Sequence, residues 1–210
     1  MQEYEHSYMD GTDRRSIAAF QGQMAGGIYV FSVLTALFLE LLLGGRLGYA
    51  ANIIQMSGMA VVTLLSYDVF KAVNKSLSLL AAFFNLVGLA SEAFRLNPHG
   101  VNIAMVFHGV FCTLIGYLIF RSAFLPRILG VLMAFAGLSW LTFSLASLAN
   151  YLSPYNLACG LIGEASVFLW LLVMSVNAQR WWDQAGTASA FSRIWKLPSP
   201  ADKGCAPAQH

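Results

Sequence analysis

Residues 101–149 read VNIAMVFHGVFCTLIGYLIF (101–120), RSAFL (121–125) and PRILGVLMAFAGLSWLTFSLASLA (126–149). Two long apolar runs therefore flank a short basic loop. A helix needs about 20 apolar residues to cross the hydrocarbon core of a bilayer. The runs lack the alternation of barrel strands, and so short a loop forces neighbouring helices to be antiparallel. This segment predicts a helical hairpin that spans a membrane.

The same pattern recurs along the chain, which is 58% hydrophobic and only 10% charged. We predict an all-α bundle of six transmembrane helices, at Met24–Leu43, Asn52–Phe70, Ser76–Phe94, Val101–Phe120, Pro126–Ala149 and Asn156–Val176. Residues 1–23 are expected to form an N-terminal tail and residues 24–176 the membrane domain. The Trp-rich segment 177–197 predicts a short interfacial helix, and residues 198–210 a disordered tail.

The positive charges fix the expected orientation, because cytoplasmic loops retain Lys and Arg during insertion. Only Arg46 and Arg95 fall in the odd-numbered loops. The other ten of the twelve Lys and Arg residues lie in the two tails and the even-numbered loops: Arg14, Arg15, Lys71, Lys75, Arg121, Arg127, Arg180, Arg193, Lys196 and Lys203. We therefore predict a multi-pass membrane protein with both termini on the cytoplasmic side.

Several function classes are disfavoured. A net charge of +2 with no basic face argues against nucleic-acid binding. GxSxG and phosphate-cradling glycine loops are absent from the sequence, which favours a protein that is not an enzyme. The three cysteines have no metal-ligand spacing, and no Lys lies in mid-membrane to bind retinal. We predict no cofactor, and the lipid bilayer as the main partner.

Ionisable residues inside spans are costly and are candidate functional groups. Glu40, Glu92, His108 and Glu164 all fall in the predicted outer half of the bilayer, whereas Asp68 lies near the inner end of its span. Three of these carboxylates have a structural explanation as members of ion pairs, because a basic residue lies close by in sequence. The expected pairs are Asp68 with Lys71, Glu92 with Arg95, and Glu40 with Arg46.

Glu164 is harder to explain by an ion pair, since it lies about 12 Å down its span at a helical rise of 1.5 Å per residue. It lies between small residues that let another helix approach. Two hypotheses stay open: a ligand-binding or proton-binding site, or an interhelical hydrogen bond to His108, Asn85 or Arg95. The candidate site residues are Glu164, His108, Asn85, Glu92 and Glu40, lining one cavity open to the outside.

Three function hypotheses follow from these residues. The first is a protein with an outward-facing polar pocket, through which it binds or transports a small solute or carries out proton-linked binding or transport. The second is a non-catalytic membrane partner or regulatory subunit. The third is a membrane-embedded metal-dependent enzyme, because oxygen and imidazole ligands from several helices suit a divalent cation. No Glu-x-x-His motif supports a metal site, so its metal stays unknown.

One segment resembles a known family. Residues 117–132 (YLIFRSAFLPRILGVL) are similar to a signature of bacterial membrane proteins of the domain of unknown function 4386 family. The loop around Val73, Asn74 and Lys75 resembles that family's second inside loop, and the segment from Gly163 to Trp170 resembles its last span. The resemblance covers about residues 16–177. It implies a six-helix protein of the bacterial cytoplasmic membrane without an assigned activity.

Two positions depart from the family pattern. An Arg is common near the position of Asn85, and a His is usual at the position of Phe111, one turn after His108. The resemblance therefore implies the fold and the importance of Glu164 more than any mechanism.

The predicted topology can be tested by labelling cysteines in intact cells. A Ser153→Cys variant should react with an impermeant thiol reagent from outside, and the native Cys205 only after permeabilisation. The opposite result would reverse the orientation and every depth assigned above.

Overall fold

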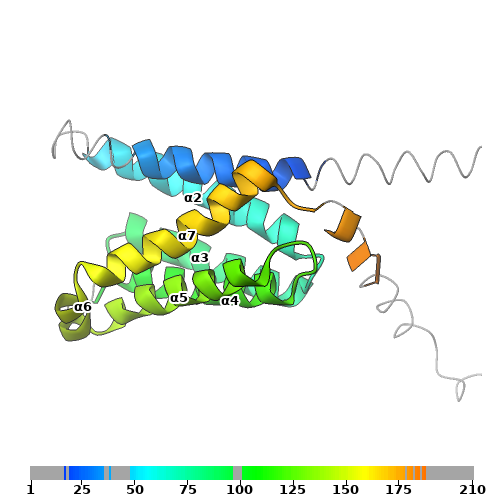
Figure 1. Ribbon diagram of the computed structural model, residues 1–210. Coiled ribbons are helices and arrows are strands. Elements are labelled where there is room, and N and C mark those ends of the chain that lie inside the picture. Colours follow the sequence, from blue (N-terminus) through cyan, green and yellow to red (C-terminus); the bar gives the residue numbers. More distant parts are fainter. Residues whose placement is uncertain are drawn as a thin grey trace, which may run out of the picture.

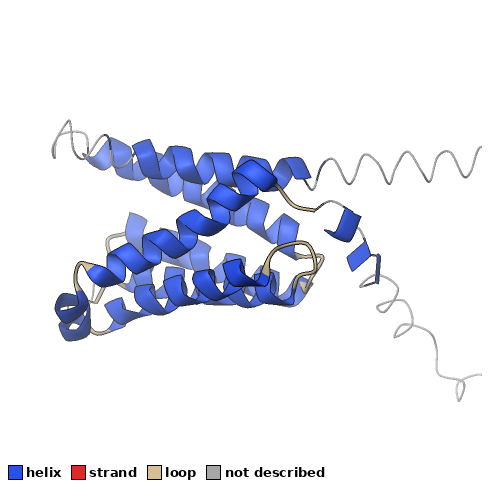
Figure 2. Cartoon of the chain, in the orientation of Figure 1, coloured by secondary structure: helices blue, strands red, loops and turns tan. Residues whose placement is uncertain are grey.

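The computed structural model describes residues 17, 19–35, 38, 48–96, 101–177, 179–181, 183–184 and 186–187. Every regular element within these residues is a helix, so the predicted all-α fold is confirmed (Figure 2). A helix over residues 19–35, called the N-terminal helix below, comes first. It is followed by α2 (Gly48–Phe70), α3 (Lys75–Ala93), α4 (Ile103–Arg121), α5 (Arg127–Leu141), the 3₁₀ turn η3 (Thr142–Ser144), α6 (Ala146–Leu152) and α7 (Tyr155–Met174).

Five of the described helices are long and apolar enough to cross a membrane. Their spans are Asn52–Phe70, Lys75–Ala93, Ile103–Arg121, Arg127–Ser144 and Tyr155–Met174. They correspond to the second to sixth predicted spans. The first prediction, Met24–Leu43, is described only to residue 35 and at residue 38, so Glu40 and Arg46 lie outside the described residues. The first span, and with it the total of six, stays a prediction, as does the orientation.

Asparagine and proline side chains account for where three helices begin. Asn74 Oδ1 accepts a hydrogen bond from the Leu77 backbone N–H at 3.0 Å, and Asn102 Oδ1 accepts one from Met105 N–H at 3.2 Å. Such caps satisfy backbone donors that have no partner within the helix. Pro126 precedes the first residue of α5, where a missing N–H costs nothing.

The fifth predicted span, Pro126–Ala149, was wrong as a single helix. The α-helix ends at Leu141, tightens into η3, and breaks at Leu145, whose backbone is extended. Thr142 Oγ1 donates to the Ser139 carbonyl at 2.6 Å, and hydroxyls that bond backbone carbonyls in this way compete with the helical ladder. The remaining residues form the short α6 at one end of the bundle (Figure 1).

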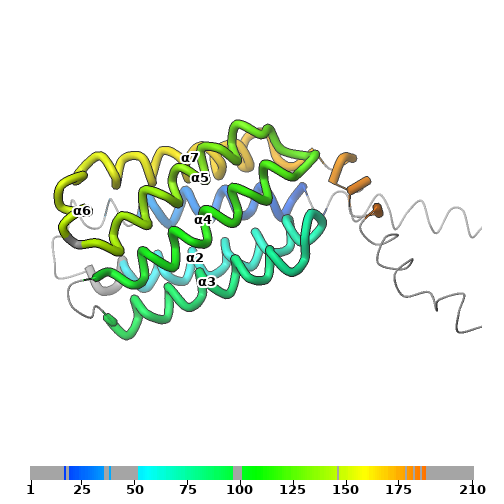
Figure 3. The backbone as a smooth tube through the Cα atoms, turned by 90° about the horizontal axis from the view of Figure 1, so that it is seen from below, coloured from blue at the N-terminus to red at the C-terminus, as the bar shows by residue number. Residues whose placement is uncertain are grey.

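The long helices surround a common centre. Neighbours pack in the order α2, α3, α4, α5 and α7 (Figure 3). The N-terminal helix contacts α7 at Gly26 and α2 at Ser32, where Gly58 provides the space. Every long helix therefore has one face towards the interior of the bundle.

Glycine pairs bring α4 and α5 into backbone contact. A Cβ on Gly137 would lie 2.6 Å from the Thr113 backbone nitrogen, and one on Gly109 would lie 2.9 Å from the Gly137 carbonyl oxygen. Further along the same two helices, Gly116 and Gly130 face each other in the same way. Helix association in lipid depends on such close packing, because lipid tails provide no hydrophobic drive.

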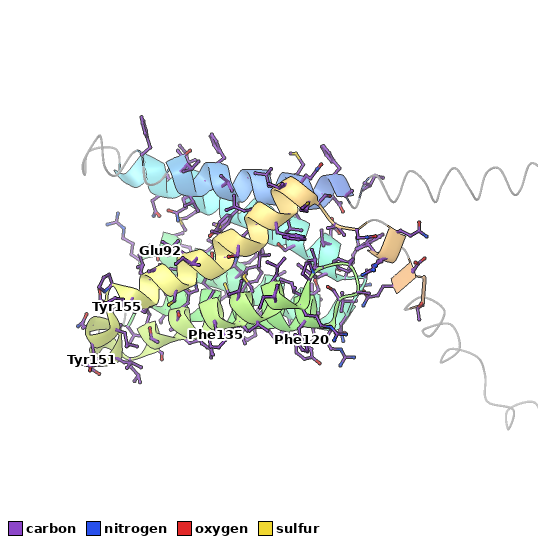
Figure 4. All side chains as sticks on the ribbon, viewed as in Figure 1. Glu92, Phe120, Phe135, Tyr151 and Tyr155 are labelled. Atoms are coloured by element: carbon purple, nitrogen blue, oxygen red, sulfur yellow. The ribbon has the colours of Figure 1, made fainter. Side chains whose placement is uncertain are left out.

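The outward faces are apolar. Phe120 and Phe135 point away from the bundle, and Phe135 is 62% exposed (Figure 4). Tyr151 and Tyr155 are strongly exposed at the α6 end of the bundle. An apolar belt with tyrosines at one end is the surface that a bilayer requires.

The described part of the C-terminal segment lies against the opposite end of the bundle. Trp181 Nε1 donates to the Val69 carbonyl at 2.8 Å, and the Ala123 N–H donates to Gln184 Oε1 at 3.0 Å. The segment is thus tied to the last turn of α2 and to the loop between α4 and α5.

The glycine contacts predict contrasting effects at two adjacent positions. A Cβ on Gly26 would lie 2.7 Å from the Leu172 backbone nitrogen, whereas one on Gly27 would meet only the Leu172 Cδ1 atom at 3.7 Å. We expect Gly26→Ala to destabilise the protein by about 1–3 kcal/mol through overpacking. Gly27→Ala should be neutral or stabilising, because Ala is the better helix former. Detergent unfolding curves of the two variants measure the difference, and equal curves would contradict the packing described.

Candidate functional site

The carboxyl group of Glu164 lies at the centre of the bundle and is 3% exposed. Tyr29 Oη donates to Glu164 Oε2 at 2.9 Å, and the indole Nε1–H of Trp140 donates to Oε1. His108 Nε2 lies 3.0 Å from the same Oε1 atom. Both carboxyl oxygens are therefore hydrogen-bonded, as burial of such a group demands.

The network continues from His108 into the other half of the bundle. His108 Nδ1 lies 2.9 Å from Asn85 Oδ1, and Asn85 Nδ2 donates to Thr63 Oγ1 at 2.6 Å. Thr63 in turn donates to the Met59 carbonyl at 2.7 Å. Asn85 and Thr63 are both buried within the bundle.

The directions of these bonds assign the protons of the imidazole. Thr63 uses its hydroxyl proton on Met59, so it accepts from the Asn85 amide, and Asn85 Oδ1 is left to accept from His108 Nδ1–H. The 3.0 Å contact of His108 Nε2 with Glu164 Oε1 then requires one further proton, because two lone pairs would otherwise face each other. The pair is then either imidazolium with carboxylate or imidazole with carboxylic acid, and both have zero net charge.

Each long helix contributes to this network. The contributors are Tyr29 (N-terminal helix), Thr63 (α2), Asn85 (α3), His108 and Cys112 (α4), Trp140 (α5) and Glu164 (α7). The thiol Sγ of Cys112 lies 3.5 Å from Glu164 Oε1 and 3.6 Å from His108 Nε2. The residues furthest apart, Tyr29 and Glu164, are separated by 135 positions in sequence.

The spacing along α7 makes room for the indole ring. Gly160 lies one helical turn before Glu164 and therefore on the same face. A Cβ on Gly160 would lie 2.6 Å from Trp140 Cε2. The absent side chain lets Trp140 lie flat over α7 and reach the carboxylate.

A cavity of about 490 Å³ leads to the network. Its wall is formed by Tyr29, Asn52, Gln55, Met56, Met59, Asn85, Gly88, Leu89, Glu92, Ala104, Met105, His108, Trp140, Leu161 and Glu164. Asn52, Glu92 and Ala104 lie near the start of α2, the end of α3 and the start of α4. The cavity therefore runs from this end of the bundle to the buried pair.

Four of the five candidate residues line this one cavity: Asn85, Glu92, His108 and Glu164. The fifth, Glu40, lies outside the described residues, as does its expected partner Arg46. The structure thus brings the four described side chains together at one cavity, and its opening to the outside stays a prediction.

The two ion pairs expected from helical spacing differ in outcome. Lys71 Nζ lies 2.5 Å from Asp68 Oδ1, and Gln21 Nε2 also donates to Asp68 at 3.4 Å. Glu92 and Arg95 do not pair with each other in the described structure, so that expectation was wrong. Arg95 follows the end of α3 with φ 52°, which turns the backbone out of the helix and removes the helical spacing on which the pair depended.

Sequence analysis missed four members of the network: Tyr29, Thr63, Cys112 and Trp140. Aromatic and hydroxyl side chains within apolar spans gave no signal of their own. For Cys112 the sequence did contain a signal, because this residue lies four positions after His108 and hence on the same face of α4.

The two departures from the family pattern lie in the network itself. Asn85 bonds His108 directly, and Phe111 stacks on the imidazole with ring centroids 5.8 Å apart. His108, one turn earlier, reaches Glu164 from its own position.

These features define an α-helical membrane protein with a buried polar network open to one end. The family described as Domain of unknown function (DUF4386) matches residues 89–175 of the chain. That stretch holds α4, α5 and α7 with His108, Cys112, Trp140 and Glu164. No curated protein and no solved structure shows significant similarity to the chain.

Removal of the Tyr29 hydroxyl should weaken the bundle. We expect Tyr29→Phe to cost about 1–2 kcal/mol of unfolding free energy, because the lost bond ends on a buried carboxyl group. The ring itself should stay stacked on Phe168, at the 4.1 Å centroid distance. Tyr155→Phe is the matched control, since Tyr155 is 75% exposed. Detergent unfolding that leaves both variants equally stable would contradict the role given to this bond.

Proposed function

We propose that this protein binds a small polar solute in the cavity, against the His108–Glu164 pair, and that solute binding is linked to the proton the pair holds. The observation that carries the proposal is that both members of this pair, although they lie inside the bundle, line the cavity. His108 side-chain exposure is 16% and that of Glu164 is 4%. A purely structural hydrogen bond between helices has no need of access from outside.

The cavity has the size and lining of a small-molecule site. Pockets for small ligands typically measure about 300–1,000 Å³, with apolar walls and a few converging polar groups. Here five Met and Leu side chains form the main apolar part of the wall. The polar groups belong to members of the network at the inner end, and to Asn52, Gln55 and Glu92 towards the mouth. A solute would therefore contact carboxyl, amide and imidazole groups at its two ends.

The pair suits proton exchange because its proton can be held by either of two neighbouring atoms, His108 Nε2 or Glu164 Oε1. His is the side chain whose charge changes most readily near neutral pH. Glu164 holds its position through Tyr29 and Trp140, so a change of protonation need not move the carboxyl group. A charged solute entering beside the pair would repel or attract that proton, which supplies the linkage.

The cavity also argues for binding over a role as a membrane partner alone. Polar residues that only held helices together would need no cavity beside them, whereas His108 and Glu164 both line one. The cavity mouth lies at the end of the bundle that the distribution of Lys and Arg assigns to the outside. On that predicted orientation the solute enters from outside.

Infrared spectra of the full-length protein in nanodiscs test the proton-binding part. A pH change should alter a carboxyl band of the wild type, and Glu164→Gln should remove that change because its amide cannot ionise. Glu92→Gln is the matched control at the cavity mouth and should keep the band. A pH-difference spectrum that is identical in wild type and Glu164→Gln would overturn the proposal.

A further inference from the structure

We propose that the inner end of the cavity is a binding site for a divalent transition-metal cation of the Zn²⁺ type, held by His108 Nε2, Cys112 Sγ and Glu164 Oε1. This inference names the ligand class of the cavity and rests on the proposed binding function. The three ligand atoms all lie within 4.8 Å of one another. One imidazole, one thiolate and one carboxylate form a donor set that suits zinc.

The distances match one face of a tetrahedron. With usual zinc–ligand bond lengths, N and O ligands lie roughly 3.3 Å apart, and S lies roughly 3.5 Å from either. The observed separations are 3.0 Å for Nε2 to Oε1, 3.5 Å for Sγ to Oε1 and 3.6 Å for Sγ to Nε2. A cation at the centre needs only a few tenths of an ångström of adjustment.

The surrounding hydrogen bonds already orient these ligands. His108 Nδ1 faces Asn85 Oδ1, which fixes the tautomer whose Nε2 is free to bind a metal. Tyr29 bonds Oε2 and Trp140 bonds Oε1, so the carboxyl group is held with Oε1 towards His108 Nε2 and Cys112 Sγ. Partners of this kind usually change metal affinity by about 10–100-fold when removed.

The cavity supplies both entry and the fourth position. His108 and Glu164 line it, whereas Cys112 is completely buried behind them. A cation arriving along the cavity would bind three protein ligands and keep a water or solute atom on the cavity side. Three protein ligands and one open position are typical of accessible zinc sites.

Charge balance favours this cation inside a membrane. Before binding, the thiol carries one proton and the pair carries one, and the site is neutral. Binding of Zn²⁺ forms bonds to the thiolate, the carboxylate and the neutral imidazole, and releases those two protons to water. The site is neutral again, which avoids a net charge at bilayer depth.

Cobalt substitution tests the site in the full-length protein in nanodiscs. Co²⁺ should bind one per chain and give a thiolate-to-cobalt charge-transfer band with tetrahedral ligand-field bands, and Zn²⁺ should abolish them by displacement. Cys112→Ser should lose the charge-transfer band, and Cys112→Ala serves if serine prevents folding. Cys159→Ser is the matched control, because that thiol is exposed. Asn85→Ala should keep the band and weaken Co²⁺ binding about 10–100-fold.

The absence of a thiolate band, or an unchanged spectrum in the Cys112 variants, would overturn the metal site. That failure is separate from failure of the proposed function, because Cys112 variants keep the His108–Glu164 pair. A protein with the Glu164 infrared signal and no thiolate–cobalt band would retain proton binding without the metal.

Discussion

The carboxyl group of Glu164 is the constraint around which the bundle is arranged. An isolated carboxylate in a medium of low dielectric constant is too costly to bury, so each of its oxygens needs a donor. The hydrogen-bonding partners come from helices far apart in sequence: Tyr29 and Trp140 donate, and His108 Nε2 lies against Oε1. Satisfying one side chain therefore fixes the positions of four helices relative to one another.

Small residues make that arrangement sterically possible. Gly160 admits the Trp140 ring, and the facing glycines of α4 and α5 bring the helix that carries His108 against the helix that carries Trp140. In lipid, such contacts supply much of the association energy. The same glycines thus serve both the packing and the hydrogen bonds at its centre.

The two ends of the bundle differ in character. One end holds the cavity mouth near Asn52 and Glu92, whereas the other holds the C-terminal segment, bonded to α2 and to the loop after α4. The cavity therefore reaches the polar centre from the end of the bundle near Asn52 and Glu92.

The sequence by itself determined the helices and most of their bounds, because span length, apolar runs and the positions of Asn and Pro act locally. It also singled out Asn85, Glu92, His108 and Glu164 as candidates, since polar groups in apolar spans stand out against their neighbours, and the structure places all four at one cavity. It failed at residues 142–149, where hydroxyl groups compete with the helical ladder, and at Arg95, whose backbone leaves the helix. Only the tertiary structure added Tyr29, Thr63, Cys112 and Trp140 to the site. These residues are ordinary within a span, and their role comes from which atoms on other helices they meet, a property that no local pattern encodes.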